Sequence, residues 1–131
     1  MEYTRITQYC GKLIPGKWQP EKQTGNGSSE NPYVMPYVVF DENVEKFLED
    51  FYALYNSLYD NNDYFQILKD NGIQLDDSLK DMDVKKLEDY VIMNMILAVI
   101  RQDRFCEGLL NDFIGSGCID KWLYELKERD R

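Results

Sequence analysis

DVKKLEDYVIMNMILAVIRQDRFCEG, residues 83–108, contains the most apolar run of the chain. Between Val91 and Ile100 the one polar residue is Asn94. A helix that is apolar on nearly every face is stable in the interior of a domain. The segment therefore predicts a buried central helix over residues 84–101, with Asp83 as its N-cap and a charged cluster at its C-terminal end.

Other segments repeat apolar residues at helical spacing and would pack around this central helix. The clearest is 41–59, where Asp41 is a suitable N-cap. Further helices are expected within 3–13, 63–71, 105–114 and 119–126. The fold class is therefore mainly α, with about five or six helices in one domain, 1–131.

Residues 33–40 are rich in β-forming side chains, although Pro36 restricts them to an edge strand or an extended segment. A small β-ribbon could form between the region of Trp18 and the run Tyr37-Val38-Val39. Between them, residues 15–31 carry prolines, glycines and serines and predict a flexible loop.

The composition excludes several kinds of chemistry. Histidine is absent, which removes histidine bases, Ser-His and Cys-His pairs, and histidine metal ligands. The three cysteines show no CxxC spacing, so neither a zinc site nor a disulfide framework is expected. We find no signal-peptide pattern and no membrane-length apolar run. The sequence thus predicts a soluble cytoplasmic protein without cofactor, metal or assigned catalytic residue.

The net charge of −9 is concentrated in residues 41–89, which hold 14 acidic and 5 basic side chains. Such a segment disfavours nucleic-acid binding, because phosphates repel carboxylates. It suits either a protein partner with a basic surface or a solvated face that maintains solubility. The oligomeric state stays open.

Polar residues of the central helix define one candidate site. Tyr90, Asn94 and Arg101 lie on one stripe with the small Ala98 between them, so they could line a concavity. Alternatively, Asn94 bonds a loop backbone and Arg101 pairs with a carboxylate.

A second candidate overlaps it at Arg101, Asp103, Arg104 and Glu107. The two arginines could bind a carboxylate or phosphate, or the two carboxylates could neutralise them in a structural ion-pair clamp, which we expect. Cys106 would lie in the first turn of the following helix if Asp103 were its N-cap. A catalytic thiol is not expected there, since no histidine base exists.

The run Arg-Gln-Asp-Arg-Phe-Cys-Glu-Gly at 101–108 resembles an uncharacterised bacterial family, domain-of-unknown-function family 6508. The family pattern has Arg-Gly-Glu-Arg-Phe-Cys-Asp-Gly after an apolar helix. The resemblance is best over 83–126 and looser over 37–55. Gln102, Asp103 and Leu97 depart from the pattern. The resemblance implies a fold and a region of interest, but no activity.

Two functions therefore remain. The acidic segment favours a non-enzymatic interaction protein that presents residues 41–89 to a partner. The alternative is a binder of, or an enzyme acting on, a small anionic ligand through Arg101 and Arg104.

Overall fold

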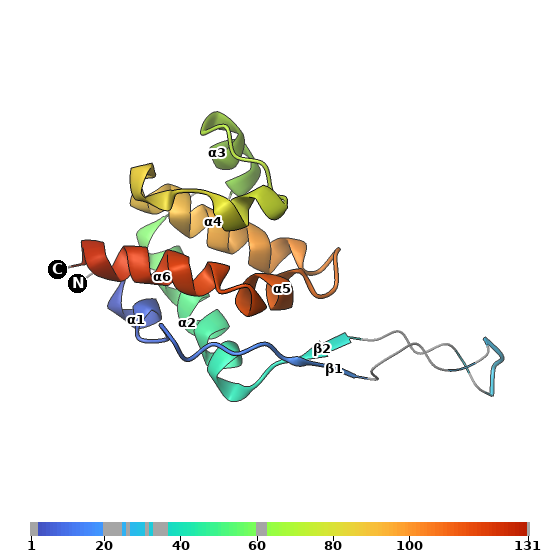
Figure 1. Ribbon diagram of the computed structural model, residues 1–131. Helices are drawn as coiled ribbons and strands as arrows, with labels where there is room; N and C mark the ends of the chain where they lie inside the picture. The colour runs from blue at the N-terminus through green and yellow to red at the C-terminus, as the bar shows by residue number, and fades with distance from the viewer. Residues whose placement is uncertain are drawn as a thin grey trace.

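Helix α4, Asp89–Gln102, runs through the middle of the computed structural model (Figure 1). All residues from Val91 to Ile100 are buried, which confirms the buried central helix. The helix begins later than predicted, however, because Asp83 caps the short 3₁₀ helix η2, Val84–Lys86, by accepting from the N–H of Lys85. An α-helix starting at residue 84 would place two lysines in its first turn, where the helix dipole disfavours positive charge.

The structure describes residues 3–19, 25, 27–30, 32, 37–59 and 63–130. Most of them are helical, which confirms the mainly α fold class. Besides α4, the elements are α1 (Thr4–Thr7), α2 (Glu42–Leu58), α3 (Tyr64–Asp70), η1 (Asp77–Asp81), α5 (Leu109–Gly115) and α6 (Cys118–Arg129).

Helix α4 lies between α3 on one side and α5 with α6 on the other (Figure 1). Helix α1 packs against both α2 and α6. The core between these helices includes large aromatic side chains: Phe47, Phe51 and Tyr55 from α2 and Trp122 from α6 are almost fully buried. Burial of this apolar surface is the main force that holds α4 in place.

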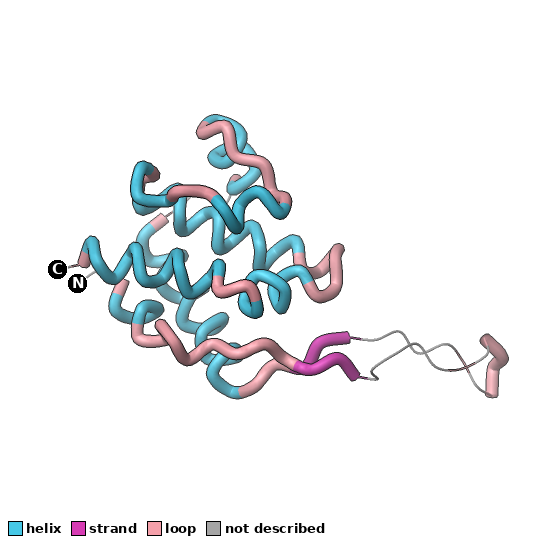
Figure 2. The backbone as a smooth tube through the Cα atoms, in the orientation of Figure 1, coloured by secondary structure: helices cyan, strands magenta, loops and turns pink. Residues whose placement is uncertain are grey.

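Strands β1 (Lys17–Gln19) and β2 (Tyr37–Val39) pair antiparallel, with Trp18 opposite Val38 (Figure 2). This confirms the small β-ribbon. A hydrogen bond joins the ribbon to the α4–α5 turn, since the Glu107 carboxylate accepts from the N–H of Val38 at 2.8 Å. The Trp18 ring also packs on Gly108, where an added Cβ would lie 2.5 Å from the ring.

Two further element boundaries differ from the sequence-based prediction. Helix α1 ends at Thr7, and irregular turns follow it. Helix α5 begins at Leu109, so Phe105 lies outside it and is 80% exposed instead of joining the apolar stripe. Gly108, at φ +94°, makes the tight turn that delays this start, a conformation which other residues rarely adopt.

Residues 20–24, 26 and 31 of the predicted loop over 15–31 lie outside the described residues, and residues 17–19 form β1. No described helix combines the length and the apolar character needed to cross a membrane.

Candidate anion-binding pocket

The charged end of α4 borders a surface pocket of about 380 Å³. Arg101 on the last turn of α4 and Arg104 in the turn that follows supply its charged lining, and Ile100 and Tyr52 supply its apolar lining. Tyr52 comes from α2, so the pocket lies where two helices distant in sequence approach each other. The arrangement brings two guanidinium groups and an aromatic ring to one concavity.

The interactions that the Arg101 side chain can make are only partly formed. Its guanidinium carbon lies 5.9 Å from the centre of the Tyr52 ring, a cation–π arrangement. Its Nε atom is buried, and no described residue accepts a hydrogen bond from it. Buried donors without a partner are rare because the lost hydration costs free energy. Arg101 therefore has capacity to bind an acceptor.

The carboxylates of the cluster are engaged elsewhere. Asp103 accepts from the backbone N–H of Leu110 at 3.0 Å, and Glu107 holds Val38 of the ribbon. The structure describes all four residues of the cluster. No ion pair joins Arg101 or Arg104 to either carboxylate. The expected ion-pair clamp is therefore wrong. Its two acids fasten the following helix and the ribbon instead.

The environment of Asp103 differs from that of an ordinary surface carboxylate. Burial raises the pKa of Asp103, and the nearby charge of Glu107 raises it further. Backbone N–H groups of Leu110, Gly108 and Leu109 act against both effects by stabilising the charged form. Asp103 thus stabilises the start of α5 from within the α4–α5 turn, not as the adjacent N-cap.

Tyr90 and Asn94 do not line the arginine pocket. The Asn94 side chain is buried, accepts from the Tyr55 hydroxyl at 2.7 Å and donates to the carbonyl of Tyr90 at 2.7 Å. Tyr90 is partly exposed, with 38% of its surface accessible. The helical stripe thus divides into a structural pair at one end and Arg101 at the other.

The three thiols lie in different environments: Cys106 is exposed, Cys10 is partly buried and Cys118 is buried. Cys106 lies in the α4–α5 turn, before the start of α5, so the prediction that placed it in the first turn of a helix is wrong. Burial raises the pKa of the Cys118 thiol to about 11 and also raises that of Cys10. Both thiols therefore stay protonated at neutral pH.

The acidic segment 41–89 is largely occupied with structural contacts. Four of its aspartates accept from backbone N–H groups at the start of helices: Asp41, Asp63, Asp76 and Asp83. Asp50 accepts from the Tyr9 hydroxyl at 2.5 Å and from Arg5 at 3.0 Å. The hydrogen bond from Tyr9 lowers the pKa of Asp50, and the same bond raises the pKa of Tyr9 to about 12.

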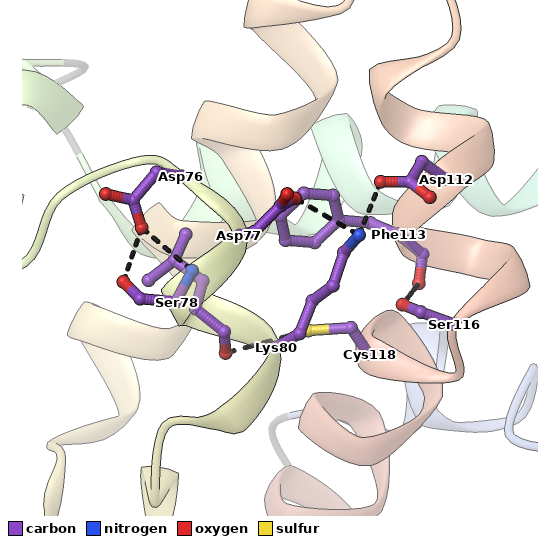
Figure 3. Close-up of polar contacts among 9 residues, drawn as sticks. Asp76, Asp77, Ser78, Lys80, Asp112, Phe113, Ser116 and Cys118 are labelled. Atoms are coloured by element: carbon purple, nitrogen blue, oxygen red, sulfur yellow. Dashed lines mark hydrogen bonds and ion pairs between the residues drawn. The ribbon is translucent and has the colours of Figure 1, made fainter.

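Figure 3 shows how one part of this segment is fastened to the helical body. Lys80 of η1 reaches between Asp77, at 3.2 Å, and Asp112 of α5. Its ammonium also lies 5.2 Å from the centre of the Phe113 ring. Nearby, Asp76 accepts from both the N–H and the hydroxyl of Ser78. The carboxylates drawn there serve the fold of this chain.

Sequence reasoning identified the two arginines of the pocket but missed Tyr52 and Ile100. A signal for Tyr52 exists. Leu48, Tyr52, Tyr55 and Tyr59 follow helical spacing at the edge of the apolar stripe of α2. That pattern places Tyr52 at the border of the core, but the approach of α2 to the end of α4 is a tertiary contact that periodicity does not reveal.

A family model described as "Family of unknown function (DUF6508)" matches residues 2–130, nearly the whole chain. Comparison with curated proteins and with solved structures gave no match.

Proposed function

We propose that this chain, which belongs to the family of unknown function DUF6508, binds a small anionic ligand in the pocket between α2 and α4. One observation carries the proposal. The buried Nε of Arg101 has no acceptor among the described residues, in a pocket where Arg104 adds a second positive charge. An anion would supply the missing acceptor and neutralise both groups.

The local charge balance supports this proposal. Asp103 and Glu107, the acidic neighbours in sequence, are directed to backbone groups of Leu110 and Val38. The arginine charges are therefore left without an ion-pair partner among the described residues. Each of the two guanidinium groups that line the pocket carries a positive charge.

The lining favours binding over catalysis. The pocket is built from two arginines, a tyrosine and an isoleucine, and the chain contains no histidine. Among the described residues, no carboxylate or thiol lines it to serve as a general base or nucleophile. We therefore propose a binding protein that recognises the charge and shape of its ligand.

The hypothesis of a partner-facing acidic segment is a second, weaker proposal. Many carboxylates of 41–89 already cap helices or pair with cations of the same chain, so they are less available to a partner. The contacts of that segment support a structural role more directly than a recognition role.

The proposal is tested by thermal shift and calorimetry with sulfate, phosphate and citrate. We expect at least one anion to raise the melting temperature, because a ligand that binds the folded state stabilises it. Arg101→Gln and Arg104→Gln should each weaken the binding about tenfold, since a hydrogen bond to a charged group contributes about 1.5–3 kcal/mol.

Arg5→Gln is the matched control, because it removes the same charge from an exposed position that pairs with Asp50. It should leave anion binding nearly unchanged. Absence of any anion effect on the wild type, or an equal loss in the Arg5→Gln protein, would refute the proposal.

A further inference from the structure

We infer that the ligand is a phosphate monoester of an aromatic group, an inference that rests on the proposed anion-binding function. The observation behind it is one pocket in which two guanidinium groups, which no described carboxylate neutralises, lie beside an apolar wall. The first feature defines the charge of the ligand and the second defines the group to which the charge is attached.

The spacing of the arginines favours one compact, doubly charged group. Arg101 and Arg104 are three residues apart, and the N–H of Arg104 donates to the carbonyl of Arg101 at 3.4 Å, so the helical turn continues between them. Side chains at this spacing start about 5–6 Å apart on one helix face. Both can therefore converge on one tetrahedral group.

A phosphate monoester matches these two charges. It carries about −1.5 to −2 at pH 7 and offers three acceptor oxygens. A carboxylate or a sulfate ester carries a single negative charge and would leave one guanidinium without a counter-charge. Arginine also binds phosphate oxygens in a bidentate manner, and the buried Nε of Arg101 has no acceptor among the described residues.

The rest of the pocket fits a flat apolar group. Tyr52 presents a ring against which the Arg101 guanidinium already lies, at 5.9 Å, and Ile100 adds an aliphatic surface beside it. The volume of about 380 Å³ falls in the range of small-molecule sites and exceeds the need of a bare phosphate ion. An aromatic ring would fill the space against Tyr52 and Ile100.

Three probes separate the contributions of charge and ring. Phenyl phosphate has both features, phenyl sulfate has the same shape with one charge less, and inorganic phosphate has the charge without the ring. By calorimetry at pH 7.5, we expect phenyl phosphate to bind about tenfold more tightly than either of the others. Its affinity should fall as the pH drops below about 6, where the phosphate group takes up its second proton.

Tyr52→Leu tests the apolar wall. This change keeps an apolar side chain, although a smaller one, and removes the ring. It should weaken phenyl phosphate about fivefold more than it weakens inorganic phosphate. Both anions share the loss of the contact between Tyr52 and Arg101, but only phenyl phosphate also loses a ring contact, which contributes about 0.5–1.5 kcal/mol. Melting curves verify that the variant is folded.

The outcomes distinguish this inference from the proposed function. Equal affinity for phenyl sulfate and phenyl phosphate would overturn the monoester inference while anion binding stands. Equal affinity for inorganic phosphate and phenyl phosphate would overturn the aromatic part. If no probe binds, and sulfate, phosphate and citrate also fail, the proposed function itself is refuted.

The same chemistry occurs in free metabolites and in phosphotyrosine side chains of proteins. Capped phosphotyrosine, with amide groups on both sides of the residue, separates these sources. Affinity equal to or above that of phenyl phosphate would assign the site to protein-borne phosphotyrosine. A clear loss would assign it to a free ester, because the added peptide groups then collide with the pocket wall.

Discussion

The acidic segment 41–89 and the arginine pair 101/104 are both charged, but their side chains are used in opposite ways. In the segment, carboxylates accept from helix N-termini, from the Tyr9 hydroxyl or from lysines of the same chain. In the pair, no described carboxylate neutralises the arginines, and one buried guanidinium nitrogen has no partner among the described residues. The number of charges in a region is therefore a poor guide to its availability for a ligand.

A further arginine makes this contrast clearer. Arg129 of α6 pairs with Asp89 at 2.7 Å and also donates to the carbonyls of Val84 and Lys85. It is a fully engaged arginine that fastens η2 and the start of α4 to α6. Its contacts show what Arg101 lacks, and the following experiments use that difference.

The largest effect is expected for Arg129→Ala. The change leaves Asp89 without its counter-charge and removes the donors to two carbonyls, so the free energy of unfolding should fall by about 2 kcal/mol. Urea denaturation measures it. If the variant were as stable as the wild type, the contacts that an arginine makes would not predict its contribution to stability.

Loss of one helix cap in the acidic segment should have a smaller effect. Asp41→Ala removes the acceptor for the N–H of Val44 at the start of α2, and we expect a loss of about 1 kcal/mol. Asp41→Asn, which retains a capping oxygen, is the control in the same denaturation experiment. Equal stability of the alanine variant and the wild type would mean that this carboxylate is not structural.

The Tyr9–Asp50 pair should be visible in an alkaline titration. The Asp50 contact raises the pKa of Tyr9 to about 12 from an ordinary value of 10.0. Between these values the unfolded state releases the phenol proton before the folded state does, so stability falls as the pH rises through this window. Tyr9→Phe should remove the phenol step near pH 12 that is seen by absorbance, and it should flatten that fall. An unchanged titration would show that the contact with Asp50 does not raise the pKa of Tyr9.

The smallest effect is expected for Arg104→Ala. No described carboxylate is left unpaired by the change, and the side chain is exposed, so thermal melts should agree with the wild type within about 0.5 kcal/mol. A loss as large as that of Arg129→Ala would restore the ion-pair clamp as the explanation of the cluster.

The sequence predicted the buried helix, the helical fold class and the ribbon because each leaves a local pattern. Val91 to Ile100 is nearly uniformly apolar, and Trp18 and Tyr37 lie in short β-forming runs. The start of α4 was missed for a related reason. An aspartate before a short helical turn looks the same whether it caps an α-helix or the 3₁₀ helix at Val84–Lys86.

The candidate site was predicted in part. Arg101 and Arg104 were named from their position at the end of an apolar helix, whereas the partners of Asp103 and Glu107 were not. Glu107 bonds a strand residue 69 positions away, a contact that depends on the fold as a whole. Proximity in sequence suggested ion pairs, but the backbone N–H groups brought close by folding compete successfully for these carboxylates.

The packing of Trp18 on Gly108 also gives the molecule an optical signature. The chain has two tryptophans, of which Trp122 is fully buried and Trp18 is 38% exposed. A dissolved quencher such as iodide thus reaches the indole of Trp18 and not that of Trp122. Fluorescence quenching therefore reports on the attachment of the ribbon to the turn that carries Arg104, without any added label.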